Sequence, residues 1–182
     1  EDWIKEAAKR GLSNISDVPE ALKAFISKHT KEVFEKANVL TDRELEARYD
    51  IRLEIYTKKI QIEARVLGDL IRNHVIPTLI KYQNFLITNV QGLKNLYPPD
   101  IYEKMAKPQL ETISEISEKL AIIKEAVEKM IEARKKANNV EDIRVKASEY
   151  STKVVPYFET IRYNVDKLEL IVDDELWPFP KY

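Results

Sequence analysis

The chain has 182 residues, of which 30 are lysine or arginine and 31 are aspartate or glutamate, so its formal net charge at pH 7 is −1. With this balance we expect neither nucleic acid nor a membrane as a partner. The absence of cysteine excludes disulfides and thiolate metal sites, and three glycines are too few for nucleotide-binding loops or β-rich folds. A cysteine-free chain without a run of eighteen apolar residues fits the reducing cytosol, so we expect a cytoplasmic protein.

The first 40 residues predict short helices. One helix is predicted from Asp2 to Arg10, with Gly11 as its C-terminal stop, and two more follow before residue 40. Helices of this length are not stable alone in water. We therefore expect residues 1–40 to be a lead-in packed on a larger bundle of residues 41–182, with both parts forming one structural domain.

The stretch from Thr41 to Ile76 predicts the first long helix. Thr41 followed three residues later by Glu44 is a capping-box sequence, which marks a helix start. Apolar residues then recur at steps of three and four, which places one apolar stripe along the helix. The stripe consists of Leu45, Tyr49, Leu53, Tyr56, Ile60, Ala64, Leu67, Ile71 and Val75. Pro77 lacks an amide donor, but the apolar rhythm continues beyond it, so we expect a kink there and a helix to about Asn95.

Two more long helices are predicted after a turn at Tyr97–Asp100. The first spans about Ile101 to Asn138, with an irregular start because of Pro108, and the second spans about Val140 to Val172, with a kink at Pro156. Their apolar residues recur at steps of three and four, which is typical of coiled-coil-like packing. These residues are Ile113, Ile116, Leu120, Ile123, Val127 and Met130 in the first, and Ile143, Ala147, Tyr150, Val154, Phe158, Ile161, Val165, Leu168 and Val172 in the second. Three long helices joined by tight reversals predict an all-α, up-down-up bundle.

The sequence predicts no catalytic or metal-binding constellation. Neither His29 nor His74 follows a glutamate by three residues, the spacing that a di-metal site in a helical bundle requires. Serine nucleophiles lack a glycine elbow, and no phosphate-binding glycine motif occurs. Glu63 lies near the apolar stripe and could be a buried carboxylate with a shifted pKa, but an ion pair with Lys59 is the simpler interpretation. For His74, beside Pro77, we expect a polar cap on the carbonyls that the proline leaves free.

The C-terminal tail is rich in aromatic residues. Trp177, Phe179 and Tyr182 lie within six residues, and Pro178 and Pro180 prevent the tail from continuing a helix. Leaving three large aromatic side chains in water is unfavourable. The three aromatic residues are therefore candidate docking residues, which either fold back onto the bundle or dock on another domain or subunit. Folding back is the favoured interpretation.

Three stretches resemble the C-terminal region of type III glutamine synthetases. They are EDWIKEAAKRGLSNISDVPEAL with the following VLTDRELEARYDI, then YTKKIQIEARVLGDLIRNHVIPTLIKY, and the ending VDDELWPFPKY. The middle stretch is similar to the family's Ile-x-Ile-Glu-Ala core with a later proline, and the ending resembles its Trp-Pro-Phe-Pro-aromatic tail. Because the stretches lie at both ends and in the middle, the resemblance extends over essentially the whole chain.

The resemblance implies a non-catalytic helical appendage. The family joins ammonia to glutamate with ATP and Mg or Mn, in ring-shaped homo-oligomers, and its nucleotide and metal contacts lie in a β-rich catalytic domain upstream. None of those motifs occurs here, so no catalytic, cofactor-binding or metal-binding residue is assigned to this chain. We expect an excised fragment whose partners are the upstream catalytic domain of the same chain and other subunits, and which serves assembly, shielding or regulation.

Two alternatives come from other functional classes. A free-standing helical adaptor would bind partner helices through an exposed seam, and a start codon directly before Glu1 would favour it. A metal-dependent bundle oxidase would retain metal through purification, which we do not expect.

Overall fold

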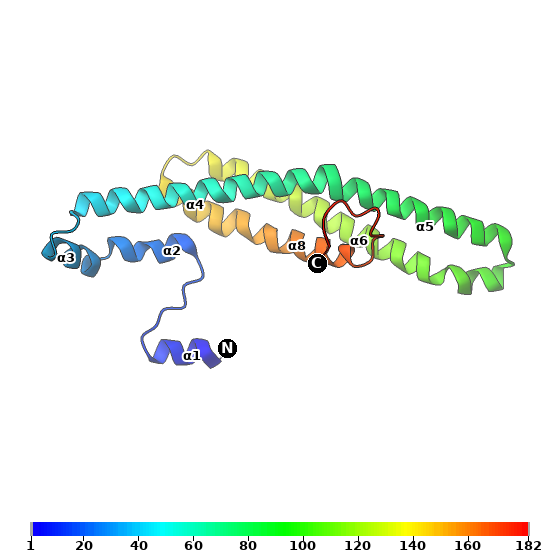
Figure 1. Ribbon diagram of the computed structural model, residues 1–182, viewed down its shortest axis with the longest axis horizontal. Coiled ribbons are helices and arrows are strands. Elements are labelled where there is room, and N and C mark those ends of the chain that lie inside the picture. Colours follow the sequence, from blue (N-terminus) through cyan, green and yellow to red (C-terminus); the bar gives the residue numbers. More distant parts are fainter. Residues whose placement is uncertain (1, 182) are drawn as a thin grey trace.

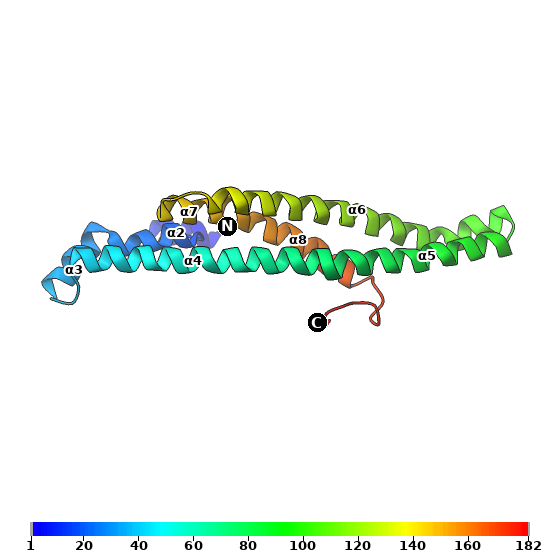
Figure 2. The same cartoon turned by 90° about the horizontal axis from the view of Figure 1, so that it is seen from above.

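Three helical rods lie side by side, each running antiparallel to the one before it in the chain (Figures 1 and 2). The computed structural model describes residues 2–181, and every regular element in that range is helical. In chain order the elements of the rods are α4 (Asp42–Leu70), η2 (Ile71–Val75), α5 (Ile76–Leu96), α6 (Pro99–Asn138), α7 (Ile143–Glu149), η3 (Tyr150–Val154) and α8 (Val155–Glu169). The first rod contains α4, η2 and α5 and is about 80 Å long at 1.5 Å per residue. Helix α6 returns along it, and the remaining elements form the third rod, so the predicted all-α, up-down-up bundle is confirmed.

Local side-chain caps fix where the rods begin. The Thr41 hydroxyl accepts a hydrogen bond from the Glu44 amide (3.3 Å), and the Glu44 carboxylate accepts one from the Thr41 amide (2.8 Å), which is the predicted capping box. Asp142 caps α7 by accepting hydrogen bonds from the amides of Arg144 (2.8 Å) and Val145 (2.9 Å). These caps stabilise the turns at which the chain enters the first and third rods.

The first and third rods continue through their prolines, and the predicted kinks take the form of π-helical turns. In η2 the amide of Ile76 donates to the carbonyl of Ile71, five residues back, and in η3 the amide of Val155 donates to that of Tyr150. Each π-helical turn ends two residues before a proline. The wider turn relieves the contact between the proline ring and the preceding carbonyls.

Pro108 does not disturb α6, so the irregular start predicted there is wrong. The helix begins at Pro99, where a proline is favoured in the first turn, and it runs through Pro108 without interruption. Pro108 is exposed, so water can bind the carbonyl of Lys104, four residues earlier, which has lost its amide donor.

The main core lies where the three rods meet. Its fully buried side chains include Ile71, Leu79, Ile116, Ile123, Met130, Tyr150, Ile161 and Leu168. All of these belong to the predicted apolar pattern, Leu79 to the part that continues beyond Pro77, and each buried leucine or isoleucine contributes roughly 1.5–3 kcal/mol. Leu120, another predicted stripe residue, is only partly buried against this core.

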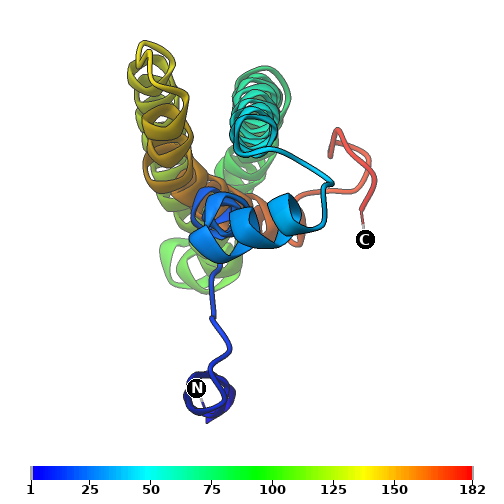
Figure 3. The same ribbon diagram turned by 90° about the vertical axis from the view of Figure 1, so that its left-hand side faces the viewer.

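The lead-in packs on the first rod through part of its length. Its elements are α1 (Asp2–Lys9), α2 (Val18–Leu22), η1 (Lys23–Ile26) and α3 (Lys28–Lys36). Leu22, Phe25 and Ile26 pack on a second, smaller core that contains Tyr49 and Leu53. By contrast, α1 lies apart from all three rods (Figures 1 and 3). None of the helices within residues 2–181 has the length and apolar character needed to span a membrane.

Candidate docking sites

The C-terminal tail folds back over the junction of α4 and α5. In Figure 2 it lies on the side of the first rod that faces away from α6. Trp177 is 7% exposed and belongs to the main core, and Phe179 is partly buried against that core. The Phe179 ring lies 5.9 Å from the imidazole of His74 in η2 and 6.2 Å, edge-on, from the Trp177 ring, measured between centroids. The aromatic tail therefore covers the π-helical turn of the first rod.

Polar contacts fix the fold of this tail. The Lys181 ammonium donates to the carbonyl of Val172 (2.7 Å) and to the carboxylate of Asp174. The Asp173 carboxylate accepts a hydrogen bond from the Glu175 amide (2.7 Å), and the Asp173 carbonyl accepts one from the Trp177 amide (3.0 Å). The structure thus seats Trp177 and Phe179 on their own chain, whereas Tyr182, the third candidate docking residue, lies outside the described residues.

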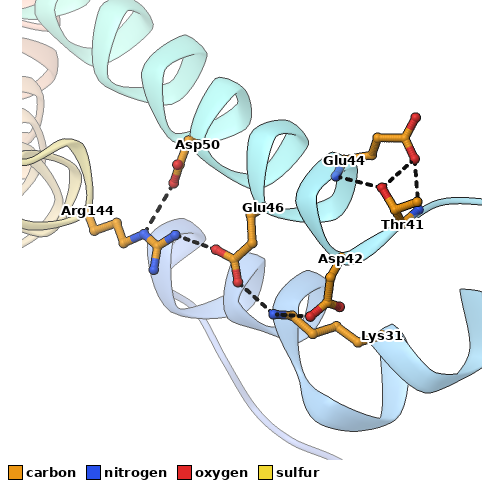
Figure 4. Close-up of polar contacts among 7 residues, drawn as sticks. All are labelled: Lys31, Thr41, Asp42, Glu44, Glu46, Asp50 and Arg144. Atoms are coloured by element: carbon orange, nitrogen blue, oxygen red, sulfur yellow. Dashed lines mark hydrogen bonds and ion pairs between the residues drawn. The ribbon is translucent and has the colours of Figure 1, made fainter. Parts of the chain in front are cut away.

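A charged cluster joins the lead-in, the first rod and the third rod (Figure 4). Glu46 of α4 lies at its centre and accepts hydrogen bonds from Lys31 of α3 (2.8 Å) and from the Arg144 guanidinium of α7. Lys31 also contacts Asp42 (3.3 Å), and Arg144 also donates to Asp50 (3.2 Å). The hydrogen bonds from Lys31 and then Arg144 lower the pKa of the Glu46 carboxyl. This cluster, which we call the Glu46 cluster, ties three segments together at one end of the bundle.

Two residues singled out in the sequence do not have the predicted contacts. Glu63 is exposed, and within the described chain no ion pair joins it to Lys59, so the predicted pair is wrong. His74 is also exposed, and its contact is the Phe179 ring, not the carbonyls near Pro77 that the sequence suggested. Across residues 2–181, no three His, Asp or Glu side chains come together as a metal site requires.

A groove of about 410 Å³ lies between α4 and the α6–α7 turn, and no motif in the sequence predicts it. Thr57, Gln61 and Asn138 line it, and Gln61 donates a hydrogen bond to Asn138 over 2.7 Å. Lysines and acidic residues surround it, but Glu54 is paired with Lys58 at 2.7 Å. Carboxylates that already bind side-chain cations do not fit a nucleotide–metal site.

Comparison with known proteins decides the family. Residues 1–94 match the family described as "Glutamine synthetase C-terminal domain". This chain belongs to that family. It is 44% identical over 182 residues to a glutamine synthetase of Bacteroides fragilis and 32% identical over 181 residues to a type-3 glutamine synthetase of Dictyostelium discoideum. It is 28% identical over 182 residues to a glutamine synthetase of Butyrivibrio fibrisolvens.

The chain is much shorter than these relatives. In each comparison the match covers 100% of this chain but only 25% of the relative. The predicted resemblance to the C-terminal helical region of glutamine synthetases is therefore confirmed, over the full length that the sequence stretches indicated.

Proposed function

We propose that this chain is the non-catalytic C-terminal helical domain of a type III glutamine synthetase. The observation that carries the proposal is the match of the whole chain to one quarter of three glutamine synthetases, one of them named type-3. The parent enzyme would join ammonia to glutamate with ATP and Mg or Mn. The residues for that reaction would lie in an upstream catalytic domain of the same chain, in the cytoplasm.

Within such an enzyme the domain would serve mainly in assembly of a homo-oligomer, besides shielding or regulation. One observation in favour is a second apolar stripe on α4, which faces away from the core. Ile51, Ile55, Ile62 and Val66 lie on one side of the helix because they are separated by 4, 7 and 4 residues, and each is at least half exposed. Exposed apolar residues along one side of a long rod, with Lys58 between the two pairs, favour contact with another protein surface.

A comparison of two chains tests the non-catalytic assignment. Ligase turnover and ATP binding are measured for the longer enzyme and for the 182-residue chain. We expect glutamate-dependent phosphate release from the longer enzyme and neither activity from the 182-residue chain. Clear turnover by the 182 residues alone would contradict the proposal, and a reading frame that starts directly before Glu1 would favour the free-standing adaptor.

The assembly role has its own test in the longer enzyme. Ile55→Glu with Ile62→Glu places charges on the second apolar stripe, and we expect light scattering to report a smaller particle. Lys94→Glu, an exposed change at the far end of the rod, is the matched control and should leave the particle mass unchanged. An unchanged mass for the double variant would rule out this stripe as an assembly surface.

A further inference from the structure

We infer that α1 and the segment after it form a docking element for the polypeptide that precedes Asp2 in the longer enzyme. This inference rests on the proposed function. It goes further because it names which surface of the chain contacts the upstream domain. Its evidence is the arrangement of residues 2–15, none of which belongs to the Glu46 cluster or to the tail.

The α1 helix is well formed although it lies apart from the rods. Gly11 has φ +72°, the left-handed conformation that glycine adopts readily, and it ends the helix. The Leu12 amide donates to the carbonyl of Ala7 (2.9 Å), and the Gly11 amide donates to that of Ala8 (3.1 Å). This pair of bonds is a Schellman motif, which satisfies the last carbonyls of the helix. Local bonds, and not contact with the bundle, thus determine where α1 ends.

One side of α1 is apolar and the other is charged. Trp3, Ile4, Ala7 and Ala8 share one side at helical spacing, whereas Lys5, Glu6, Lys9 and Arg10 lie on the other. On the charged side Arg10 and Glu6 form an ion pair at 2.9 Å. This separation of apolar and charged residues is typical of a helix that packs its apolar side on a protein surface.

Within residues 2–181 only the small Ala7 on this side is buried (5% exposed), next to the chain that the Schellman bond from Leu12 folds back, and the large apolar side chains stay uncovered. Trp3 is 67% exposed and Ile4 is 48% exposed, and the following Leu12 and Ile15 are 54% and 47% exposed. Figure 3 shows α1 well separated from the rods, joined to them only by the segment that leads to α2. A helix of eight residues is unstable alone in water. Burying these four side chains on a partner would supply the missing stabilisation.

The upstream domain is the partner that fits this position. The chain spans 25% of its relatives and belongs to a C-terminal domain family, so the remaining part of such an enzyme would precede residue 1. In such an enzyme that part would be covalently joined to α1 and would therefore be present at a high effective concentration. Even a modest apolar contact would then keep α1 docked.

Site-specific cross-linking in the longer enzyme tests this inference. Trp3 is replaced by p-benzoylphenylalanine on the apolar side, and Lys5 is replaced in the same way on the charged side as the matched control. We expect position 3 to cross-link to residues upstream of Asp2, and position 5 to give at least tenfold less of that product. Mixing isotopically light and heavy subunits tells contacts within a chain from contacts between copies. Cross-links from position 3 to residues 41–181 or to another copy would overturn the inference, as would equal yields from the two positions.

Amide exchange gives an independent readout in the same enzyme. Trp3→Ala with Ile4→Ala removes the large apolar side chains without lowering helix propensity, so loss of docking should raise exchange of the α1 amides at least tenfold. Lys5→Ala with Lys9→Ala should leave it unchanged. Fast exchange of α1 already in the unmodified enzyme would refute docking. Ligase turnover of the same preparation separates the two proposals, because an inactive enzyme with a cross-linked α1 contradicts only the proposed activity.

Discussion

At the scale of single residues, the Glu46 side chain connects three segments of the chain, α3, α4 and α7. It accepts hydrogen bonds from Lys31 of the lead-in and from Arg144 of the third rod, which lie 15 and 98 residues away in the sequence. We expect Glu46→Gln to destabilise the fold by about 0.5–1 kcal/mol at pH 7 in urea unfolding, the range for a partly exposed charge network. Glu54→Gln, which affects only a pair with Lys58 one turn away, should have a smaller effect.

The effect of Glu46→Gln should depend on pH in a known direction. The pKa of Glu46 is lower in the folded chain than in the unfolded chain, so its contribution is present above the unfolded pKa of about 4.3. That contribution is lost as the pH falls through the folded pKa, when the carboxyl becomes protonated. The difference between wild type and variant should therefore shrink from pH 7 toward pH 3. A difference that stays constant over this range would show that Glu46 acts through packing and not through its charge.

Trp177 is the residue that holds the tail on the bundle. Because its side chain is 7% exposed and packs in the main core, we expect Trp177→Ala to cost about 3 kcal/mol, as for other large-to-small core changes. Leu170→Ala, at an exposed position on the approach to the tail, should change stability by less than about 0.5 kcal/mol. Equal losses in thermal unfolding would mean that the tail does not contribute to the core.

At the scale of elements, the two π-helical turns have the same effect: each keeps the apolar residues that follow it facing the core. The core-facing residues Ala64 and Ile71 are seven residues apart, whereas Ile71 and Leu79 are eight apart. In the third rod, Tyr150 and the partly buried Phe158 are also eight residues apart. In a regular helix, a spacing of eight residues where the pattern otherwise repeats every seven would turn the following apolar residues away from the core. One extra residue held in a π-helical turn restores the alignment.

Deleting that extra residue tests the explanation. Removal of exposed Asn73 from η2, together with Pro77→Ala so that a regular helix is possible, should leave α5 in register and the thermal midpoint within a few degrees of wild type. Removal of exposed Lys59 from the regular part of α4, with the same Pro77→Ala change, should rotate the downstream seam by about 100° and abolish cooperative unfolding. If both deletions lowered the thermal midpoint equally, the extra residue in η2 would not be what keeps α5 in register.

The long helices also show how much of the fold can be predicted from the sequence. Apolar spacing and the capping box at Thr41 predicted the order of the long helices, because these signals are local. The kinks at Pro77 and Pro156 are predicted from the prolines, which lack an amide donor. The eight-residue steps beside them do not predict π-helical turns, because two steps of four residues are also compatible with a plain helix. Glu46 and Arg144 could not be paired in advance, since their contact depends on how distant segments meet.

At the scale of the whole molecule, the number of rods that lie side by side changes along the long axis. Near η2, three rods and the tail surround a continuous core, whereas the far end consists of α5 and α6 alone (Figures 1 and 2). In this two-helix end, between residues 80 and 115, the buried apolar side chains are Val90 and Ala106. Two helices with so small a shared core gain little stabilisation from packing, and helix stability in proteins comes mostly from packing.

This difference predicts a gradient of local stability along the rods. In hydrogen exchange followed by mass spectrometry, amides between residues 90 and 106 should exchange at least tenfold faster than those between residues 64 and 79, because the far end can open without breaking the main core. Val90→Leu, which adds apolar volume between α5 and α6, should slow exchange at the far end while leaving the region near η2 unchanged. If both regions exchanged at one rate, the bundle would unfold as a single cooperative unit and the two-helix end would be as stable as the three-rod centre. Slow exchange at the far end in the longer enzyme only would instead locate a partner surface there, since binding protects the helix pair that packing alone leaves open.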